Sequence, residues 1–442
     1  MDSTAATTRA VVAPRTWRKV GFRIIPLVGL AYVASYIDRA NVGYIAAPMS
    51  RDLHLTSGQI GLAAGLFFIG YILVEVPSNM MLRRFGARKW IARIMITWGL
   101  VTAATAAVNS AATLFLARLL LGLAEAGLAA GILLYLTLWF PRRQRSWALS
   151  AFFLMTPVSS VIGSPLAAAL LEWGQNLFGI AGWRSLFLVE GVLTILVSIL
   201  ILAFLPDRPG NARWLDDREK AAIEATLAAE TDEHRARGAL TGLRQALTSG
   251  RVWLMAVTWF AIAFGLYPLQ FFLPTMIRSI THSIGKSGDV SSVLLSAIPY
   301  AVAVLALLLW ARFAARRTAV TATAVPMTVG VAGLLLATFT SSGTLFVVAV
   351  CVSVAGIMTA MPQFWRIPAI GLTGAAAASG IALINSVSNV SGFVGPYFTG
   401  AIASATGSFT WALLAIAIIM TAGLAVLLSV GRRMERLDGS LS

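Results

Sequence analysis

Four ionisable residues stand inside stretches of the chain that are otherwise apolar. Asp38 and Arg39 are adjacent in the segment YIDRANVGY, and Arg118 and Glu125 lie in RLLLGLAEAGLAAG. A charge within a lipid-spanning helix costs about 2.5 to 3.5 kcal/mol on insertion scales, so such residues mark functional sites by default. Arg118 and Glu125 are separated by almost two helical turns, which places them on one helix face about 10 Å apart along the axis. We therefore expect both to line one cavity.

The residue types suit an anionic ligand. The planar fork of arginine matches the two oxygens of a carboxylate better than a lysine ammonium does, which favours Arg39 and Arg118 as anion ligands. Glycines in the segment around Glu125 also leave room beside the charges, although small residues equally permit close helix packing. The alternative is a buried ion-pair network that only holds two helices together.

The second half of the chain offers neutral polar groups in place of charges. Between Asp289 and Glu435 there is no acidic residue, so a carboxylate that carries a proton through the membrane must lie in the first half. The neutral candidates for substrate contacts are Tyr71 in the first half and Tyr267, Gln270, Asn385 and Asn389 in the second. The two asparagines could instead join one helix to another by hydrogen bonds.

These residues belong to a chain whose solvent must be mostly lipid. Of its 442 residues, 58% are hydrophobic and only 12% are charged. A soluble domain of this length could not bury so much apolar surface. Apolar stretches of about 20 residues recur along it, each long enough to cross a bilayer as a helix. The twelve predicted spans are 20–46, 57–79, 90–108, 113–138, 146–170, 185–205, 252–277, 290–310, 319–339, 344–364, 375–400 and 408–430.

A charged segment divides the spans into two groups of six. Its apolar positions recur at helical spacing from Asp216 to Glu230, which predicts a surface helix. The predicted fold is all-α, with twelve transmembrane helices in two pseudo-symmetric six-helix bundles that alternate access to a central site. The expected parts are a tail at 1–17, a bundle at 18–206, a cytoplasmic linker at 207–250, a bundle at 251–431 and a tail at 432–442.

The distribution of basic residues predicts the topology. Most of the 34 Lys and Arg residues fall in the two tails and in alternate loops, so the net charge of +16 reflects positive-inside topology rather than nucleic-acid binding. Both termini are therefore expected in the cytoplasm. The chain has a single cysteine, Cys351, and its three histidines all fall in predicted loops, so these residues offer no metal cluster. We expect no cofactor and no enzymatic activity.

Several long motifs resemble a known family. The segments YIDRANVGY, GYILVEVPSNMMLRRFGARKWIARIMITWG, RLLLGLAEAG, LYLTLWFP, LPDRPGNARWL and GIALINSVSNVSGFVGPY together look like the anion:cation symporter family of the major facilitator superfamily, especially its tartrate- and phthalate-like carboxylate permeases. The resemblance covers nearly all of Trp17 to Val430. It implies that Arg39 and Arg118 bind the anion and that Asp38 and Glu125 carry protons.

The same resemblance implies that Tyr71 and Asn385 contact the substrate. The chain also departs from the family pattern. Leu128, Ala129 and Ala130 replace an aromatic pair and a proline that relatives often carry, which would reshape the pocket. In addition, Arg83 and Ala311 stand where the loops after spans 2 and 8 usually contain an acid, so gating contacts based on those acids are not expected.

The sequence thus predicts a monomeric, multi-pass transporter of the inner, plasma membrane that imports a small organic anion by proton symport. The anion would be a tartrate-, phthalate- or sugar-acid-like carboxylate. An anion exchanger or uncoupled facilitator with the same fold is the closest alternative, and a non-transporting ligand sensor is another. Glu125 is expected to be the main coupling site, because Asp38 adjoins an arginine whereas Glu125 lies among small apolar residues that favour its neutral form.

Overall fold

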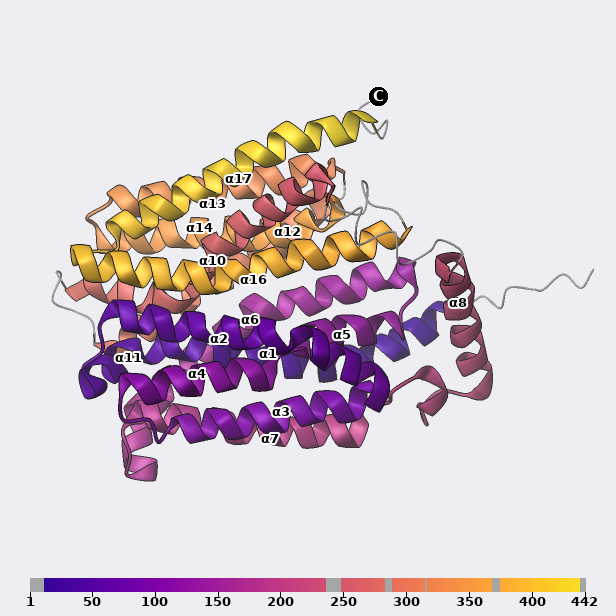
Figure 1. Ribbon diagram of the computed structural model, residues 1–442, viewed down its shortest axis with the longest axis horizontal. Helices are drawn as coiled ribbons and strands as arrows, with labels where there is room; N and C mark the ends of the chain where they lie inside the picture. Colours follow the sequence, from indigo (N-terminus) through magenta and orange to yellow (C-terminus); the bar gives the residue numbers. More distant parts are fainter. Residues whose placement is uncertain (1–11, 236–247, 283–287, 315, 368–373, 438–442) are drawn as a thin grey trace, which may run out of the picture.

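The computed structural model describes residues 12–235, 248–282, 288–314, 316–367 and 374–437, and within these ranges the chain is helical, without strands (Figure 1). Several helices begin at side-chain caps. The side chains of Thr56 and Ser110 each accept a hydrogen bond from the backbone N–H three residues later, and the side chain of that later residue accepts one from the backbone N–H of the cap. This reciprocal pairing satisfies backbone groups that a helix start leaves unpaired.

Seven helices form the first bundle. They are α1 (Pro14–Leu53), α2 (Ser57–Phe85), α3 (Ala87–Thr105), α4 (Ala111–Glu125), α5 (Leu128–Thr137), α6 (Arg142–Phe178) and α7 (Gly182–Phe204). Helix α3 packs along α7, α2 along α4, and α1 along α6. Helix α1 therefore runs through the middle of the molecule, where it can present Asp38 and Arg39 to its neighbours.

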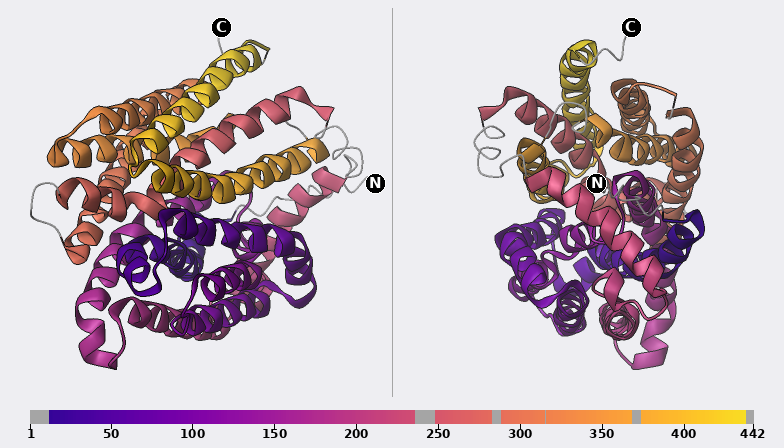
Figure 2. Two further views of the ribbon diagram at one scale, coloured as in Figure 1. Left: turned by 60° about the vertical axis from the view of Figure 1, so that its left-hand side comes forward. Right: turned by 90° about the vertical axis from the view of Figure 1, so that its right-hand side faces the viewer.

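The second bundle follows a connecting segment. That segment contains η1 (Pro209–Asn211) and α8 (Asp217–Arg235), so the surface helix predicted from Asp216 to Glu230 is confirmed. The bundle comprises α10 (Gly250–His282), α11 (Asp289–Leu295), α12 (Ala297–Ala314), α13 (Ala319–Phe339), α14 (Gly343–Phe364), α16 (Gly374–Thr406) and α17 (Thr410–Leu437). Figure 2 shows the two bundles as separate groups, indigo to magenta and orange to yellow.

The predicted spans match the packed helices. Ten segments of the described chain are long and apolar enough to cross a membrane, with α4 and α5 forming one of them and α11 and α12 another. The other two predicted spans are α3 and α16. Helix α3 is short and carries three basic residues near its start, yet it packs lengthwise on α7, and α16 packs lengthwise between α2 and α10.

One predicted span is interrupted. The sequence predicts a continuous helix over 113–138, but α4 ends at Glu125, and Gly127 adopts a φ of 89°, a left-handed backbone that favours glycine. A Cβ at Gly127 would also lie 2.4 Å from the hydroxyl of Ser78 on α2. The break lets α5 pass close to α2, and it places the Glu125 carboxylate at the end of a helix, within the span that α4 and α5 form together.

The two bundles approach each other closely at the end of the molecule opposite α8 (Figure 1). A Cβ at Gly61 of α2 would lie 2.4 Å from the carbonyl oxygen of Pro396 on α16. At the same end, the Gly58 N–H donates to Ser404 at 2.7 Å. Asp289 of α11 forms ion pairs with Arg51 of α1 and Arg278 of α10. These contacts join the bundles at that end.

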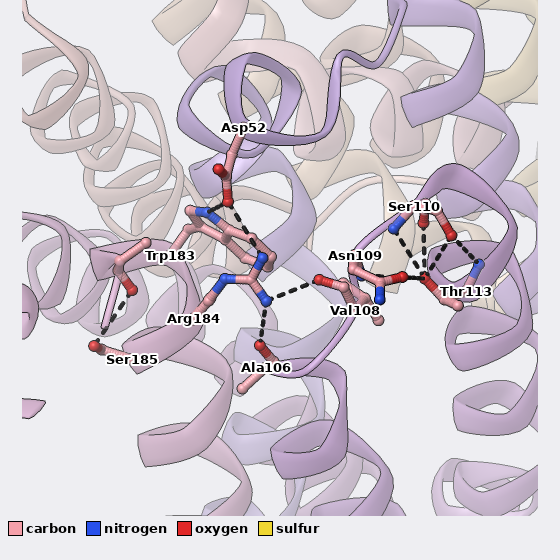
Figure 3. Close-up of polar contacts among 10 residues, drawn as sticks. Asp52, Ala106, Val108, Asn109, Ser110, Thr113, Trp183, Arg184 and Ser185 are labelled. Carbon is pink, nitrogen blue, oxygen red and sulfur yellow. Dashed lines mark hydrogen bonds and ion pairs between the residues drawn. The ribbon is translucent and has the colours of Figure 1, made fainter. Parts of the chain in front are cut away.

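A smaller polar cluster holds the first bundle together at this end. The Arg184 guanidinium donates to the carbonyl oxygens of Ala106 and Val108, both at 2.8 Å, and contacts the Asp52 carboxylate at 3.3 Å (Figure 3). The indole N–H of Trp183 donates to the same carboxylate at 3.1 Å. The start of α7 is thereby attached to the end of α1 and to the turn after α3.

At the α8 end, the connecting segment supplies an acid to the turn between α2 and α3. The Asp207 carboxylate accepts a hydrogen bond from the backbone N–H of Arg88 at 2.9 Å, at the start of α3. A carboxylate is favourable at a helix N-terminus because it faces unpaired N–H groups. The side chain of Arg83, noted above as a departure from the family pattern, lies outside the described residues.

Candidate functional site

A buried ion pair in the first bundle joins α1 to the end of α4. The Nε and Nη2 atoms of Arg39 lie 2.8 and 2.7 Å from Oε1 of Glu125, and the Ser35 hydroxyl donates to the same oxygen at 2.6 Å. The Arg39 side chain is 7% exposed and that of Glu125 is fully buried. The other carboxylate oxygen, Oε2, has no hydrogen-bond partner among the described residues. Glu125 is therefore held by one arginine and one hydroxyl.

Arg118 lies in the same region but is not paired. Its side chain is fully buried, and none of its three guanidinium nitrogens has a hydrogen-bond partner within the described ranges. It interacts electrostatically with Asp38, Glu125 and Arg39, and its guanidinium lies 5.2 Å from the ring centre of Phe67. A buried arginine with unused donors costs considerable free energy, so an anion is the natural complement of this group.

Aromatic rings surround the arginines. The guanidinium of Arg39 lies 5.3, 5.1 and 5.0 Å from the ring centres of Tyr36, Phe67 and Tyr71. Such contacts stabilise a cation while leaving its in-plane donors available. The predicted substrate ligand Tyr71 thus lies beside Arg39, in the first bundle.

The second bundle meets this aromatic group through α10. The ring of Tyr267 lies 4.8 Å from that of Phe68, which is the neighbour of Phe67 on α2. Gln270 is buried on the same helix, and its backbone carbonyl lies beside Gly43 of α1, where a Cβ would approach it to 2.9 Å. The predicted residues of α10 therefore lie at the contact between bundles.

A hydrogen bond between α16 and α2 connects the two bundles. The Asn389 amide of α16 donates to Oε2 of Glu75 on α2 at 3.1 Å. The Glu75 carboxylate of the first bundle thus contacts α16 of the second bundle. Asn385 lies one turn before Asn389 on the same helix and is half-buried.

Asp38 has a different environment from the one expected. Its Oδ1 accepts hydrogen bonds from Thr102 and from the Asn41 amide, both at 3.0 Å, and the same amide nitrogen donates to Oε2 of Glu190 at 3.0 Å. The expectation that an arginine pairs with Asp38 while Glu125 lies in apolar surroundings is wrong. Consecutive residues on a helix point in different directions. Asp38 of α1 therefore faces α3 and α7, whereas Arg39, the next residue, faces Glu125 of α4.

Reasoning from the sequence missed part of this arrangement. Glu190 was not assigned to the site, although an acidic residue within a predicted span was a signal that could have included it. Ser35, Asn41 and Thr102 are small polar residues, which are common in packed membrane helices and carry no signal of their own. Within the described ranges, no group of three His, Cys, Asp or Glu residues could hold a metal ion.

Comparisons with known proteins agree with this architecture. A model of the Major Facilitator Superfamily matches residues 28–396. A protein of Agrobacterium vitis named "Putative tartrate transporter" is 40% identical over 405 residues, covering 91% of this chain and 88% of that protein. A Pseudomonas putida protein named "Putative metabolite transport protein NicT" is 37% identical over 397 residues, covering 89% of each.

A solved structure supports the fold independently. A bacterial homologue of the human lysosomal transporter Spinster, described as inward-facing and unoccupied, superposes with a TM-score of 0.75 at 17% identity, covering 96% of this chain and 99% of that one. The family model spans most of the chain, and the fold is all-helical with two bundles and buried charges at their centre. The chain is therefore a multi-pass membrane transporter, not an enzyme, and it belongs to the Major Facilitator Superfamily.

Proposed function

We propose that the protein imports a small organic carboxylate across the bacterial inner membrane together with protons. The observation that carries this proposal is Arg118, a fully buried guanidinium whose three nitrogens have no hydrogen-bond partner within the described ranges. A buried arginine without a partner is costly, whereas a carboxylate can satisfy two of its donors at once. The names of the tartrate transporter and NicT relatives are consistent with an organic substrate.

The anion would bind between the bundles. Arg118 and Arg39 supply positive charge from the first bundle, and Tyr71 lies beside them. The second bundle supplies the neutral groups of α10 and α16, namely Tyr267, Gln270, Asn385 and Asn389. A ligand that contacts both bundles stabilises the arrangement of the two bundles in which both contacts are made. Alternating access requires such a dependence of bundle arrangement on the bound ligand.

Proton coupling follows from the Arg39–Glu125 ion pair. While Glu125 is ionised, Nε of Arg39 donates a hydrogen bond to its Oε1 atom and Nη2 lies 2.7 Å from the same oxygen. A proton on the carboxylate would remove its charge and release the guanidinium to the substrate. Protons and anion would therefore bind cooperatively, and by linkage the bound anion would raise the affinity for protons. Asp38 is the second proton carrier in this scheme.

The contacts between bundles suggest which side is open. If both termini are cytoplasmic, the joined end opposite α8 is the external side, and this conformation is closed to the outside. In this orientation the linker 207–250 connects bundles 18–206 and 251–431 on the cytoplasmic side, with the tails 1–17 and 432–442 beside it. We propose that the transporter works as a monomer, because each chain contains both bundles.

The test is transport by the purified protein in proteoliposomes, with L-tartrate as the first probe. A proton gradient, acidic outside, should drive uphill accumulation, and a proton ionophore should abolish it. Arg118→Leu should remove tartrate protection against thermal unfolding, whereas Arg88→Leu, at an exposed position, should retain it.

The same assay separates the alternatives. An exchanger or uncoupled facilitator would equilibrate tartrate across the membrane but would not accumulate it in response to the gradient. A sensor would bind without uptake. Tartrate protection that survives Arg118→Leu would contradict the assignment of Arg118 to the anion site. If tartrate does not bind, phthalate and sugar acids are the next probes, and failure of the whole set would refute the carboxylate proposal.

A further inference from the structure

A second group of acids lies in the first bundle, apart from the Arg39–Glu125 pair. Asp38 of α1 and Glu190 of α7 are 1% and 4% exposed, and the amide nitrogen of Asn41 donates to one oxygen of each at 3.0 Å. One nitrogen at hydrogen-bonding distance from both carboxyl groups brings them close together. Their remaining oxygens, Oδ2 and Oε1, are buried without a hydrogen-bond partner within the described ranges.

Among the described residues, no Lys or Arg forms an ion pair with either carboxyl group of this pair. Thr102 of α3 is a neutral donor to Asp38, and the Tyr44 hydroxyl of α1, which lies near Ser160 and Ser164 of α6, interacts electrostatically with Glu190. Arg118 of α4 and Arg39 of α1 attract the Asp38 carboxylate electrostatically, and Glu125 of α4 repels it. None of these groups neutralises two carboxylates.

Two arginines on the helices of this pair, Arg39 of α1 and Arg184 of α7, have other partners. Arg39 is paired with Glu125, and Arg184, on the same helix as Glu190, contacts Asp52 and two backbone carbonyls at the end of the bundle (Figure 3). Two ionised carboxylates this close, buried and without a paired cation, repel each other strongly. One proton on either carboxyl group would reduce the charge of the pair from −2 to −1.

We propose that Asp38 and Glu190 form a proton-binding site in which one proton is shared by two carboxyl groups bridged by Asn41. The proton resides on one of the two free oxygens, Oδ2 or Oε1, while the Asn41 amide holds the other oxygen of each group. Glu190 thereby becomes a third buried acid that takes part in proton binding, in addition to Asp38 and Glu125.

The site has a consequence for the neighbouring arginine. Because Asp38 also interacts with Arg118, the position of the shared proton alters the negative charge that Arg118 experiences. With the proton on Asp38, Arg118 faces a neutral group and is more available to an anion. This consequence rests on the proposed function, whereas the proton site itself does not.

The experiment uses the full-length protein in lipid without any substrate, so it is independent of the anion's identity. Infrared difference spectroscopy during a pH titration detects the carbonyl stretch of a protonated carboxyl group. We expect wild type at neutral pH to show a signal from a buried protonated carboxyl group that disappears at alkaline pH. Glu190→Gln should lower the pH at which this signal disappears, because Asp38 no longer faces a second carboxylate, whereas Glu172→Gln, which changes an exposed acid on α6, should keep the wild-type signal and pH dependence.

Two results would overturn the proposal: a wild-type spectrum without a protonated carboxyl group at neutral pH, or a signal that disappears at the same pH in Glu190→Gln as in wild type. If that variant does not fold, Asp38→Asn provides the second test. It should retain the signal and move the pH at which the signal disappears, because the partner carboxylate is gone. An unchanged pH dependence in Asp38→Asn would show that the two groups do not share a proton.

Discussion

Replacing Arg39 with lysine tests whether the geometry of the guanidinium, rather than its charge, is what the site requires. Nε and Nη2 of Arg39 lie 2.8 and 2.7 Å from one oxygen of Glu125, and three aromatic rings lie 5.0 to 5.3 Å from the guanidinium carbon. A lysine ammonium is compact and keeps the charge, but it cannot present two donors in a plane or lie flat among the rings.

The expected loss can be worked from these contacts. One charge-assisted hydrogen bond contributes about 1.5 to 3 kcal/mol, and a buried cation–aromatic contact about 0.5 to 2 kcal/mol. Losing one hydrogen bond and part of the aromatic contact amounts to about 2 to 4 kcal/mol, which is roughly a 30- to 700-fold change in an equilibrium constant. The empty carrier loses the same contacts to Glu125, so part of the effect cancels. We therefore expect about 30-fold weaker tartrate binding.

The assay is tartrate uptake and tartrate-dependent thermal protection, measured on Arg39→Lys and on Arg88→Lys as the matched control. Arg88 is exposed, and only its backbone N–H makes a described hydrogen bond. Both variants should reach the membrane in wild-type amounts, and only Arg39→Lys should lose uptake. Near-normal uptake by correctly inserted Arg39→Lys would refute the reasoning, because charge alone would then suffice.

Glu125→Gln mimics the protonated acid permanently, so the variant should bind and exchange tartrate across proteoliposomes but should not concentrate it under an imposed pH gradient. Gly122→Ala should destabilise the protein by about 1 to 3 kcal/mol through overpacking, because the added Cβ would lie 2.0 Å from the carbonyl oxygen of Phe67. A lower midpoint of thermal unfolding would measure this loss of stability. The hydrogen bond from Lys19 holds the pKa of the Glu219 carboxyl below its ordinary value, so this contact stabilises the attachment of α8 at neutral pH and is lost as the pH falls through that lowered pKa. The protection of α8 amides against hydrogen exchange, corrected for the pH dependence of the intrinsic exchange rate, should thus fall on acidification in wild type, and should be low and less dependent on pH in Glu219→Gln.

Each of these predictions has a control. pH-driven accumulation by Glu125→Gln at the wild-type rate would place the coupling proton elsewhere, with Asp38 as the next residue to test. Gly250→Ala, where no atom lies within 4 Å of the added Cβ, should leave thermal unfolding unchanged, and an equal loss in both variants would reject the packing argument. Glu224→Gln, at an exposed position elsewhere on α8, should preserve the pH dependence seen in wild type.

Much of the fold could be predicted from the sequence because lipid restricts the choices. A backbone that crosses a membrane must satisfy its own hydrogen bonds, so each long apolar segment becomes a helix. For the same reason, the few charged residues within those segments could be recognised from the sequence as candidates for buried functional positions. The structure buries all four of them, Asp38, Arg39, Arg118 and Glu125. The helical linker segment was visible through its periodic apolar residues.

The pairing of these residues was decided by tertiary structure. Adjacent residues on a helix point about 100° apart, so Asp38 and Arg39 face different neighbours, and only the packing of α1 determines which. The left-handed backbone at Gly127 ends α4 directly after Glu125 and brings that carboxylate to Arg39. Sequence spacing within one span contains no information about a side chain on another.

The same limit applies between the bundles and around Glu190. The Glu75–Asn389 hydrogen bond joins residues far apart in the chain, and it exists because α2 and α16 lie side by side. Their approach depends on glycines such as Gly61, where the absence of a side chain lets one backbone contact the other. The sequence by itself determined which residues had to be buried in the membrane, whereas helix rotation and close backbone contacts decided which of them interact.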